Sequence, residues 1–327
     1  MCTAITLQTK NHYFGRNLDL EYSYIETVTI TPRNFPFYFR KIFSLPLHHA
    51  IIGMAYVKDE YPLYYDAMNE MGLCMAGLHF PANAFYHPSK KNMDNIAPFE
   101  LIPWVLGQCT TVKEAAHLLE KTNLIGEAFA SDLPVSPLHF MISDKNDSIV
   151  VEPSERGIKI YSNPTGVLTN NPTFDIQLFG LNNYRNLSPR MLANTFSPDL
   201  DLQTYSNGLG ALGLPGDWSS QSRFVKAIFV KSNSVCDPSE HSSVNQFFHI
   251  LSSVEHPRGS VEVKKDLFEI TVYSSCCSMD KGIYYYRTYD NSRIIGVDMF
   301  LENLEANQLI SYPLLKEQEF FIQNELH

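Results

Sequence analysis

The second residue of the chain, Cys2, heads a strand-like segment that runs to Leu7. If the initiator Met1 is removed, this residue carries both a thiol and a free α-amine. A thiol acts as a nucleophile only as its thiolate, and a neutral α-amine, which titrates at about 7.7–8.0, is able to accept the thiol proton. Nucleophile and base would then lie on one residue, as in enzymes whose nucleophile is activated by an N-terminal amine.

Two charged residues lie on the next strand-like segment, which runs from His12 to Asp19 and follows a turn at 9–11. A hairpin would bring the far end of this segment back beside Cys2. Arg16 would then favour the thiolate through its fixed positive charge. Asp19 would accept a hydrogen bond from the α-amine and hold it in place. The alternative is a surface ion pair at the end of a strand.

Four motifs, taken in order along the chain, resemble the choloylglycine hydrolase family of N-terminal-nucleophile amidases. They are MCTAIT, FGRNLDL, LTNNP (Leu168 to Pro172) and GLPGDWSSQSRF (Gly213 to Phe224). The resemblance runs from Cys2 to about Pro313 and is closest to the bile salt hydrolases of Gram-positive gut bacteria. The family also includes penicillin V acylases.

The resemblance implies a role for each residue that matches a family motif. Cys2 matches the nucleophile and its α-amine the base, Arg16 the arginine beside the thiolate, and Asp19 the carboxylate that orients the amine. Asn170 matches the asparagine of the oxyanion site, and Arg223 the second active-site arginine. Acyl transfer develops an oxyanion, and fixed donors aimed at it lower the barrier.

One position of the oxyanion site departs from the family pattern. His79, in Gly77 to Phe80, stands where bile salt hydrolases usually have Asn and penicillin V acylases often have Tyr. The backbone N–H survives the substitution, and the ring is larger than an amide and titrates near neutral pH. We retain His79 as a catalytic residue, and both bile salts and penicillin V stay open as substrates.

Four residues occupy positions that resemble the family's substrate-lining loops, namely Leu18, Tyr24, Phe129 and Leu133. A bile acid needs an apolar wall with few polar groups, although each of these residues is also compatible with an ordinary core. The resemblance implies hydrolysis of the amide bond of glycine- or taurine-conjugated bile salts through a thioester, with no cofactor and no metal. The alternatives are a penicillin V acylase or related amidase, and an inactive bile-salt-binding protein.

Composition excludes several other classes of function. The 327 residues are 44% apolar and carry a net charge of −10, which argues against nucleic acid, whose phosphates require a basic face. No apolar run approaches the roughly 20 residues of a membrane span, and no secretory signal is apparent. We therefore expect a cytoplasmic enzyme with no membrane partner. The six cysteines do not form a disulfide framework, and we expect Cys276 to Cys277 to supply one core thiol and one surface thiol.

Strand-like runs separate from helical ones along the chain, which predicts an antiparallel α+β protein. We expect a single domain over residues 1–327, Thr111 as a helix N-cap, and an exposed loop at 233–243. The family resemblance implies the four-layer αββα fold, with two stacked antiparallel sheets flanked by helices, and a homotetramer. Strands are predicted at 2–8, 12–18, 26–31, 50–56, 73–79, 138–143, 148–152, 158–161, 166–169, 267–275, 281–288 and 294–300, and helices at 98–107, 112–121, 219–232 and 243–254.

Overall fold

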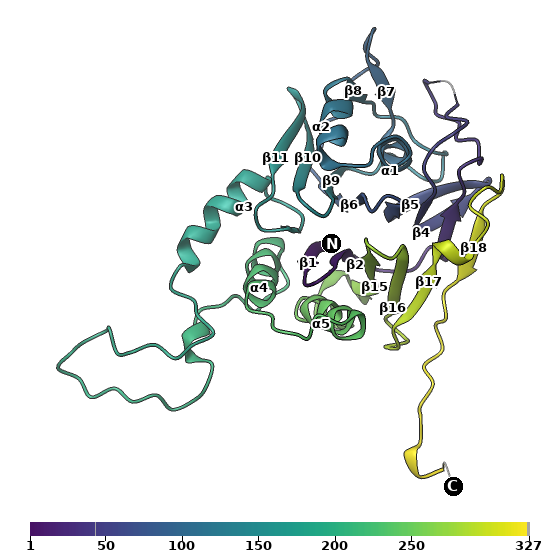
Figure 1. Cartoon of the computed structure of the whole chain (residues 1–327). Coiled ribbons are helices and arrows are strands. Elements are labelled where there is room, and N and C mark those ends of the chain that lie inside the picture. Colours follow the sequence, from purple (N-terminus) through teal and green to yellow (C-terminus); the bar gives the residue numbers. More distant parts are fainter. Residues whose placement is uncertain (43, 326–327) are drawn as a thin grey trace.

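Two antiparallel sheets form the centre of the computed structural model, which describes residues 1–42 and 44–325 (Figure 1). In spatial order the first sheet comprises β12 (Val167–Leu168), β1 (Cys2–Gln8), β2 (His12–Leu20), β15 (Ile270–Ser278), β16 (Ile283–Thr288) and β17 (Ile295–Asp298). The second comprises β11 (Gly157–Ser162), β10 (Ser148–Ser154), β9 (Leu138–Ser143), β6 (Cys74–His79), β5 (Tyr61–Asn69), β4 (Ile51–Lys58), β3 (Thr27–Thr31) and β18 (Ile310–Pro313).

Helices cover the outer face of each sheet (Figure 1). Helices α1 (Leu101–Leu106) and α2 (Val112–Glu120) pack on the second sheet, whereas α4 (Ser220–Ser232) and α5 (Glu240–Ser252) pack on the first. The layers therefore run α, β, β, α, which confirms the predicted fold. The remaining elements are α3 (Phe174–Gly180), the short strands β7 (Asp94–Ile96), β8 (Thr122–Leu124), β13 (Glu262–Lys264) and β14 (Leu267–Phe268), and 3-10 turns at Pro98–Glu100, Leu181–Tyr184, Leu209–Ala211, Met299–Leu301 and Gln323–Glu325.

Helix boundaries follow local capping chemistry. Thr111 Oγ1 accepts the backbone N–H of Glu114 at 3.2 Å, which confirms the predicted N-cap of α2. Ser239 likewise accepts the N–H of Ser242 at 3.4 Å and starts α5 at Glu240. The predicted loop at 233–243 is therefore wrong over its last residues, because this cap starts the helix three residues earlier than its apolar pattern does.

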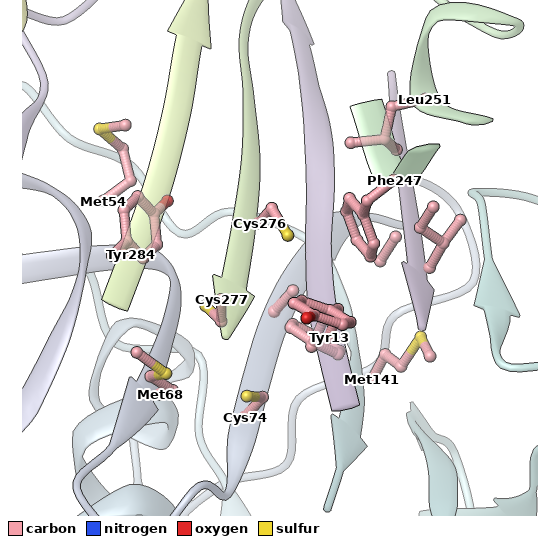
Figure 2. Packing of buried hydrophobic residues seen from close by; sticks show 14 of the residues in the cluster. Tyr13, Met54, Met68, Cys74, Met141, Phe247, Leu251, Cys276, Cys277 and Tyr284 are labelled. Atoms are coloured by element: carbon pink, nitrogen blue, oxygen red, sulfur yellow. The ribbon is translucent and has the colours of Figure 1, made fainter. Parts of the chain in front are cut away.

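The core between the sheets is rich in sulfur (Figure 2). Cys276 and Cys277 lie on opposite sides of β15, and both are fully buried. The prediction of one surface thiol is wrong, because a central strand of a four-layer fold is covered on one face by the other sheet and on the other face by helices. Within the described residues all six cysteines are free thiols.

The hairpin of β1 and β2 is tightly specified. Its register pairs Cys2 with Leu18, which confirms that the hairpin brings the far end of β2 back beside Cys2. A side chain at Gly15 would overlap the carbonyl of Ser275, since an added Cβ would lie 2.0 Å from that oxygen. Glycine thus lets β15 approach the hairpin closely and fixes its position in the sheet.

The sequence patterns missed β5, β18, α3 and the short strands β7, β8 and β13. Strand β5 contains Pro62, Asp66 and Asn69, so it lacks the apolar alternation that predicts a strand. Helix α3 is only seven residues long, which is too short for a helical period to stand out. Among the described residues no helix is both long enough and apolar enough to cross a bilayer.

Candidate active site

Cys2 begins β1, and its thiol is 3% exposed. In the hairpin Cys2 lies opposite Leu18, and Ala4 lies opposite Arg16. Because side chains alternate along a strand, the side chains of Cys2, Leu18 and Arg16 share one face of the hairpin. This face looks toward the second sheet, and all three residues line one cavity.

Arg16 is a fully buried cation fixed by backbone carbonyls of the second sheet. Its Nη1 donates to Gly77 O at 2.5 Å and to Tyr65 O at 3.2 Å. Burial opposes the charge, but the Cys2 thiol, Tyr273 and other acidic groups around it raise the pKa of Arg16 above its ordinary value. The cavity therefore contains a permanent positive charge beside the sulfur.

Asn170 follows β12 and lies against the backbone of Cys2. Its Oδ1 accepts the N–H of Cys2 at 2.9 Å and Nη2–H of Arg223 at 2.8 Å. Its Nδ2 donates to the carbonyl of His79 at 2.7 Å. A side-chain amide has two N–H groups, so a second donor remains on Nδ2 beside the nucleophile.

Arg223 reaches the same place from α4 on the opposite side of the first sheet. Its Nη1 donates to Cys2 O and to Thr3 Oγ1, both at 2.6 Å, and its Nε donates to Trp218 O at 2.9 Å. Together with Nη2, one guanidinium ties the backbone of the nucleophile to the side chain of Asn170. Burial lowers the pKa of Arg223 from its ordinary value, against the raising effect of Asp19.

Asp19, near the end of β2, lies beside the N-terminus of the chain and is fully buried. Its Oδ1 accepts the hydroxyl of Thr271 at 2.6 Å. Met1 is present in the structure, where its ammonium donates to Asp19 O at 2.7 Å and forms an ion pair with Glu269. Burial lowers the pKa of the Met1 ammonium, although the Cys2 thiol and Asp19 oppose the shift. With Met1 attached, the nitrogen of Cys2 is an amide and has no basic lone pair.

His79 ends β6 and lines the same cavity as Cys2 and Arg16. Its backbone carbonyl accepts a hydrogen bond from Asn170 Nδ2, so the backbone of His79 is part of the site independently of the imidazole ring. Burial and the Met1 ammonium lower the pKa of His79, whereas Glu21 opposes them. The ring is therefore neutral at pH 7.

The cavity has a volume of about 350 Å³, within the range of small-molecule sites. The four residues that the family resemblance placed in substrate-lining loops, Leu18, Tyr24, Phe129 and Leu133, all line it, and their part in substrate binding stays a prediction. Arg40 lies over the ring of Phe129 at 5.4 Å and holds that part of the wall. Lining residues that the sequence patterns did not identify are Leu20, Tyr56, Leu63, Tyr65, Phe99, Ile102, Glu127, Asp132, Pro134, Leu138 and Phe140.

Supporting residues for Asn170 also escaped prediction. Gln177 Nε2 donates to Asn170 O at 2.7 Å, and Ser220 Oγ accepts the Asn170 N–H at 2.8 Å. His139 lies behind them, within 2.9 Å of Thr169 O. Ser220 does fall inside the last of the recognised motifs, whereas Gln177 lies on the unpredicted α3 and no pattern in the sequence marks it.

Comparison with protein families confirms the resemblance that the motifs indicated. Residues 2–312 match the model of linear amide C–N hydrolases, choloylglycine hydrolase family. The chain is 56% identical over 324 residues to a bile salt hydrolase/transferase of Lactiplantibacillus plantarum, covering 99% of this chain and 100% of the relative. It is 37% identical over 323 residues to a bile salt hydrolase/transferase of Clostridium perfringens, covering 97% and 98%.

Solved structures show the same fold. A crystal structure of a mutant conjugated bile acid hydrolase from Clostridium perfringens matches with a TM-score of 0.92 at 36% identity, covering 99% of this chain and 100% of that one. A penicillin V acylase from Agrobacterium tumefaciens matches with a TM-score of 0.75 at 20% identity, covering 95% and 91%. The second likeness concerns the fold alone.

Proposed function

Because the chain belongs to the choloylglycine hydrolase family of linear amide C–N hydrolases, we propose that it hydrolyses the amide bond of glycine- or taurine-conjugated bile salts. One observation carries the proposal. The buried thiol of Cys2, with Arg16 beside it, lies in an apolar cavity of about 350 Å³. The apolar walls of this cavity would bind the large ring system of a bile acid and place its amide carbonyl beside the thiol of Cys2.

The proposed chemistry begins with removal of Met1, which turns the Cys2 nitrogen into a free amine. This amine takes the thiol proton, and the thiolate attacks the amide carbonyl. The remaining N–H of Asn170 and the backbone N–H of His79 stabilise the oxyanion. The amine then gives its proton to the departing glycine or taurine nitrogen, and a thioester remains on Cys2.

Water completes the reaction. The Cys2 amine, now neutral again, accepts a proton from a water molecule that attacks the thioester carbonyl. The second tetrahedral intermediate collapses and the C–S bond breaks. The thiolate of Cys2 is regenerated, and the free bile acid is released. All bonds are exchanged between acyl carbon, sulfur, nitrogen and water, so this scheme uses no cofactor and no metal.

Charged side chains play separate parts in this scheme. Arg16 provides a fixed positive charge beside the sulfur, which stabilises the negative charge that forms once the amine has taken the thiol proton. Asp19 orients the amine. Arg223 contacts the carbonyl of Cys2 and the amide of Asn170, so it positions the nucleophile and the oxyanion donor relative to each other.

We treat residues 1–327 as one domain in which these groups act together.

Substrate selection is assigned to the walls of the cavity. Leu18, Tyr24, Phe129 and Leu133 offer apolar surface to the steroid rings. A penicillin V side chain is smaller and would leave part of this surface uncovered, which favours the bile salt. His79 keeps its backbone donor, and we expect its neutral ring to slow rather than abolish turnover.

We further propose that the protein forms a homotetramer. The segment from 186 to 207 projects far from the body between α3 and α4 (Figure 1). It displays apolar side chains to solvent, with Phe196 84%, Tyr205 85% and Leu192 53% exposed. Apolar surface of this kind usually marks a protein–protein contact. Light scattering coupled to size exclusion would measure the mass, and a monomer at micromolar concentration would contradict the proposal.

Amino acid release from glycocholate and taurocholate tests the function, with penicillin V in parallel and with the N-terminus verified by mass. Release of glycine or taurine is the expected result. Phenoxyacetate release from penicillin V alone would assign the chain to the acylase branch. Bile salt binding without any release, in protein whose N-terminus is Cys2, would support the inactive binding protein instead.

A further inference from the structure

A second buried group, His256, faces the site from behind Asp19. It lies between α5 and β13 and is fully buried. Its Nε2 is 3.8 Å from Asp19 Oδ2. With Glu269, these residues place three ligand-type atoms within 4.8 Å of one another around the N-terminus of the chain. His256 ends the segment QFFHILSSVEH, which also resembles the family, but none of the roles that the resemblance implies falls on it.

The backbone of His256 is already connected to Asp19 through Thr271. The His256 N–H donates to Thr271 Oγ1 at 2.9 Å, and that hydroxyl donates to Asp19 Oδ1 at 2.6 Å. The N–H of Thr271 returns to the carbonyl of His256 at 3.1 Å. One oxygen of the carboxylate is thus fixed by a relay that begins at His256, and the ring of the same residue faces the other oxygen.

The His256 ring and the Asp19 carboxyl group face each other without a hydrogen bond between them. Over residues 1–42 and 44–325, Asp19 Oδ2 and both ring nitrogens of His256 are buried without a hydrogen-bond partner. Such atoms are rare in native proteins and call for an explanation. The Met1 ammonium supplies one, because it lies against Glu269 and the backbone of Asp19 and its positive charge balances the two carboxylates.

Removal of Met1 takes that cation away. Asp19 Oδ2 and Glu269 would then face each other, with the Cys2 amine and the His256 ring as nearby donors. Burial lowers the pKa of His256 to about 4, with Arg223 and the Met1 ammonium acting in the same direction and Asp19 opposing them. The ring is therefore neutral at pH 7 and carries one N–H, which can be on Nε2.

We propose that His256 is a positioning residue whose Nε2–H donates to Asp19 Oδ2 and so fixes the carboxylate that orients the Cys2 amine. The inference rests on the proposed function, because it assigns His256 a part in the same reaction. Asp19 would then have Oδ1 held by Thr271 and Oδ2 held by His256, with its remaining lone pairs directed at the amine. Histidine suits this place because a neutral donor leaves the charge balance between Asp19 and the amine unchanged.

Two substitutions and one control test the proposal. His256→Gln keeps an N–H donor, whereas His256→Leu keeps the volume and removes the donor. His249→Leu, at an exposed position on α5, controls for loss of a histidine as such. The N-terminus of every variant is verified by mass, and thermal unfolding is measured for each.

The first readout needs no bile salt. The rate at which iodoacetamide alkylates Cys2, followed by peptide mass, is measured from pH 5 to 9. A carboxylate raises the pKa of a neighbouring amine, so a misplaced Asp19 should shift the acid limb of this profile to lower pH in His256→Leu. We expect the profiles of His256→Gln and His249→Leu to match that of the unaltered protein. An unshifted profile in His256→Leu would overturn the proposal.

The second readout is glycocholate hydrolysis. We expect His256→Leu to lower kcat by roughly tenfold or more, a part of the 10²–10⁴-fold that general acid–base catalysis contributes, with KM within about twofold. His256→Gln should retain most of the rate. Equal losses in both variants, accompanied by equal thermal destabilisation, would indicate a purely structural histidine. If the unaltered protein releases no amino acid but its alkylation profile depends on His256 as described, the proposed substrate is wrong and the positioning role stands.

If His256→Leu fails to fold, selective ¹⁵N labelling of histidine in the unaltered protein decides. The signal lost in His256→Gln identifies the residue. We expect a neutral ring with the proton on Nε2 from pH 5 to 8. A ring with the proton on Nδ1, or one that titrates in this range, would refute the proposal.

Discussion

Replacing Arg223 with lysine separates the hydrogen bonds that Arg223 makes in the site from the positive charge that it contributes. The guanidinium makes four hydrogen bonds from three nitrogens, to Cys2 O, Thr3 Oγ1, Asn170 Oδ1 and Trp218 O. A lysine ammonium is a single point and at best serves the two acceptors of Nη1. The bonds to Asn170 and Trp218 would be lost in Arg223→Lys, while the positive charge would remain.

The magnitude follows from those two bonds. A hydrogen bond to a charged group contributes about 1.5–3 kcal/mol, so their loss should lower the free energy of unfolding by about 3 kcal/mol at the low end of that range. Only the bond to Asn170 concerns the chemistry. Removal of one oxyanion donor lowers kcat by about 10²–10³-fold. Asn170 would be loosened rather than removed, so we expect a loss of about 10- to 100-fold, or about 1.4–2.7 kcal/mol.

The assay is urea unfolding together with kcat and KM for glycocholate. Arg293→Lys is a matched control, because Arg293 is 69% exposed and pairs only with Glu319 among the described residues. We expect kcat to fall in Arg223→Lys with KM nearly unchanged, since Arg223 does not line the cavity. A preserved kcat despite lower stability would refute the link from Arg223 to Asn170. A raised KM with unchanged kcat would mean that Arg223 binds substrate directly.

Further predictions concern the nucleophile, the oxyanion site, the hairpin and pH. Cys2→Ser should abolish amino acid release, because a hydroxyl is far less acidic than a thiol, and retained turnover would exclude Cys2 as the thiolate nucleophile. His79→Asn should raise glycocholate turnover, and unchanged or lower turnover would show that His79 does not limit the reaction. Gly15→Ala should destabilise the fold by about 1–3 kcal/mol through overlap with β15, measured by urea unfolding. His256 has a folded pKa of about 4, below its unfolded value near 6.5, so the unfolded chain binds more protons and stability falls as pH drops from 6.5 to 4. His256→Gln should remove up to roughly 3 kcal/mol of that fall in unfolding titrations, and an unchanged slope would mean that folding does not lower the pKa of His256.

The nearest parts of the site were predictable from local chemistry. The turn at 9–11 predicts the hairpin, and the hairpin alone brings the end of β2 beside Cys2. Asn170 and Arg223 reach Cys2 across 168 and 221 residues of chain, and no pattern in composition or periodicity specifies such contacts. Only their resemblance to family motifs indicated them. His256 ends the family-like segment QFFHILSSVEH, but the resemblance implied no role for it, and only the closeness of its ring to Asp19 in the folded chain indicates one.

Among the helices and strands, too, local patterns predicted some elements and missed others. Periodic apolar runs predicted the strands and helices whose side chains face one consistent environment. Strand β5 was missed because it carries Asp66 into the space between the sheets, where Tyr273 and Tyr284 donate hydroxyls to its carboxylate at 2.5 and 2.8 Å. A buried polar network breaks the apolar alternation on which the prediction depends. The failure therefore occurs where the core contains a buried carboxyl group, whose pKa is raised by burial while nearby Arg16 opposes the shift.

The distance between thiol and cation is set by the packing of the two sheets. Arg16 belongs to the first sheet, yet its Nη1 is held by Gly77 O and Tyr65 O of the second. Its backbone N–H donates to Ser275 Oγ at 3.1 Å, and that hydroxyl donates to Asp66 at 2.8 Å. A shift of one sheet against the other would therefore have to break or lengthen these hydrogen bonds. The polar network inside an otherwise apolar core thus connects the two sheets at the cation that lies beside the nucleophile.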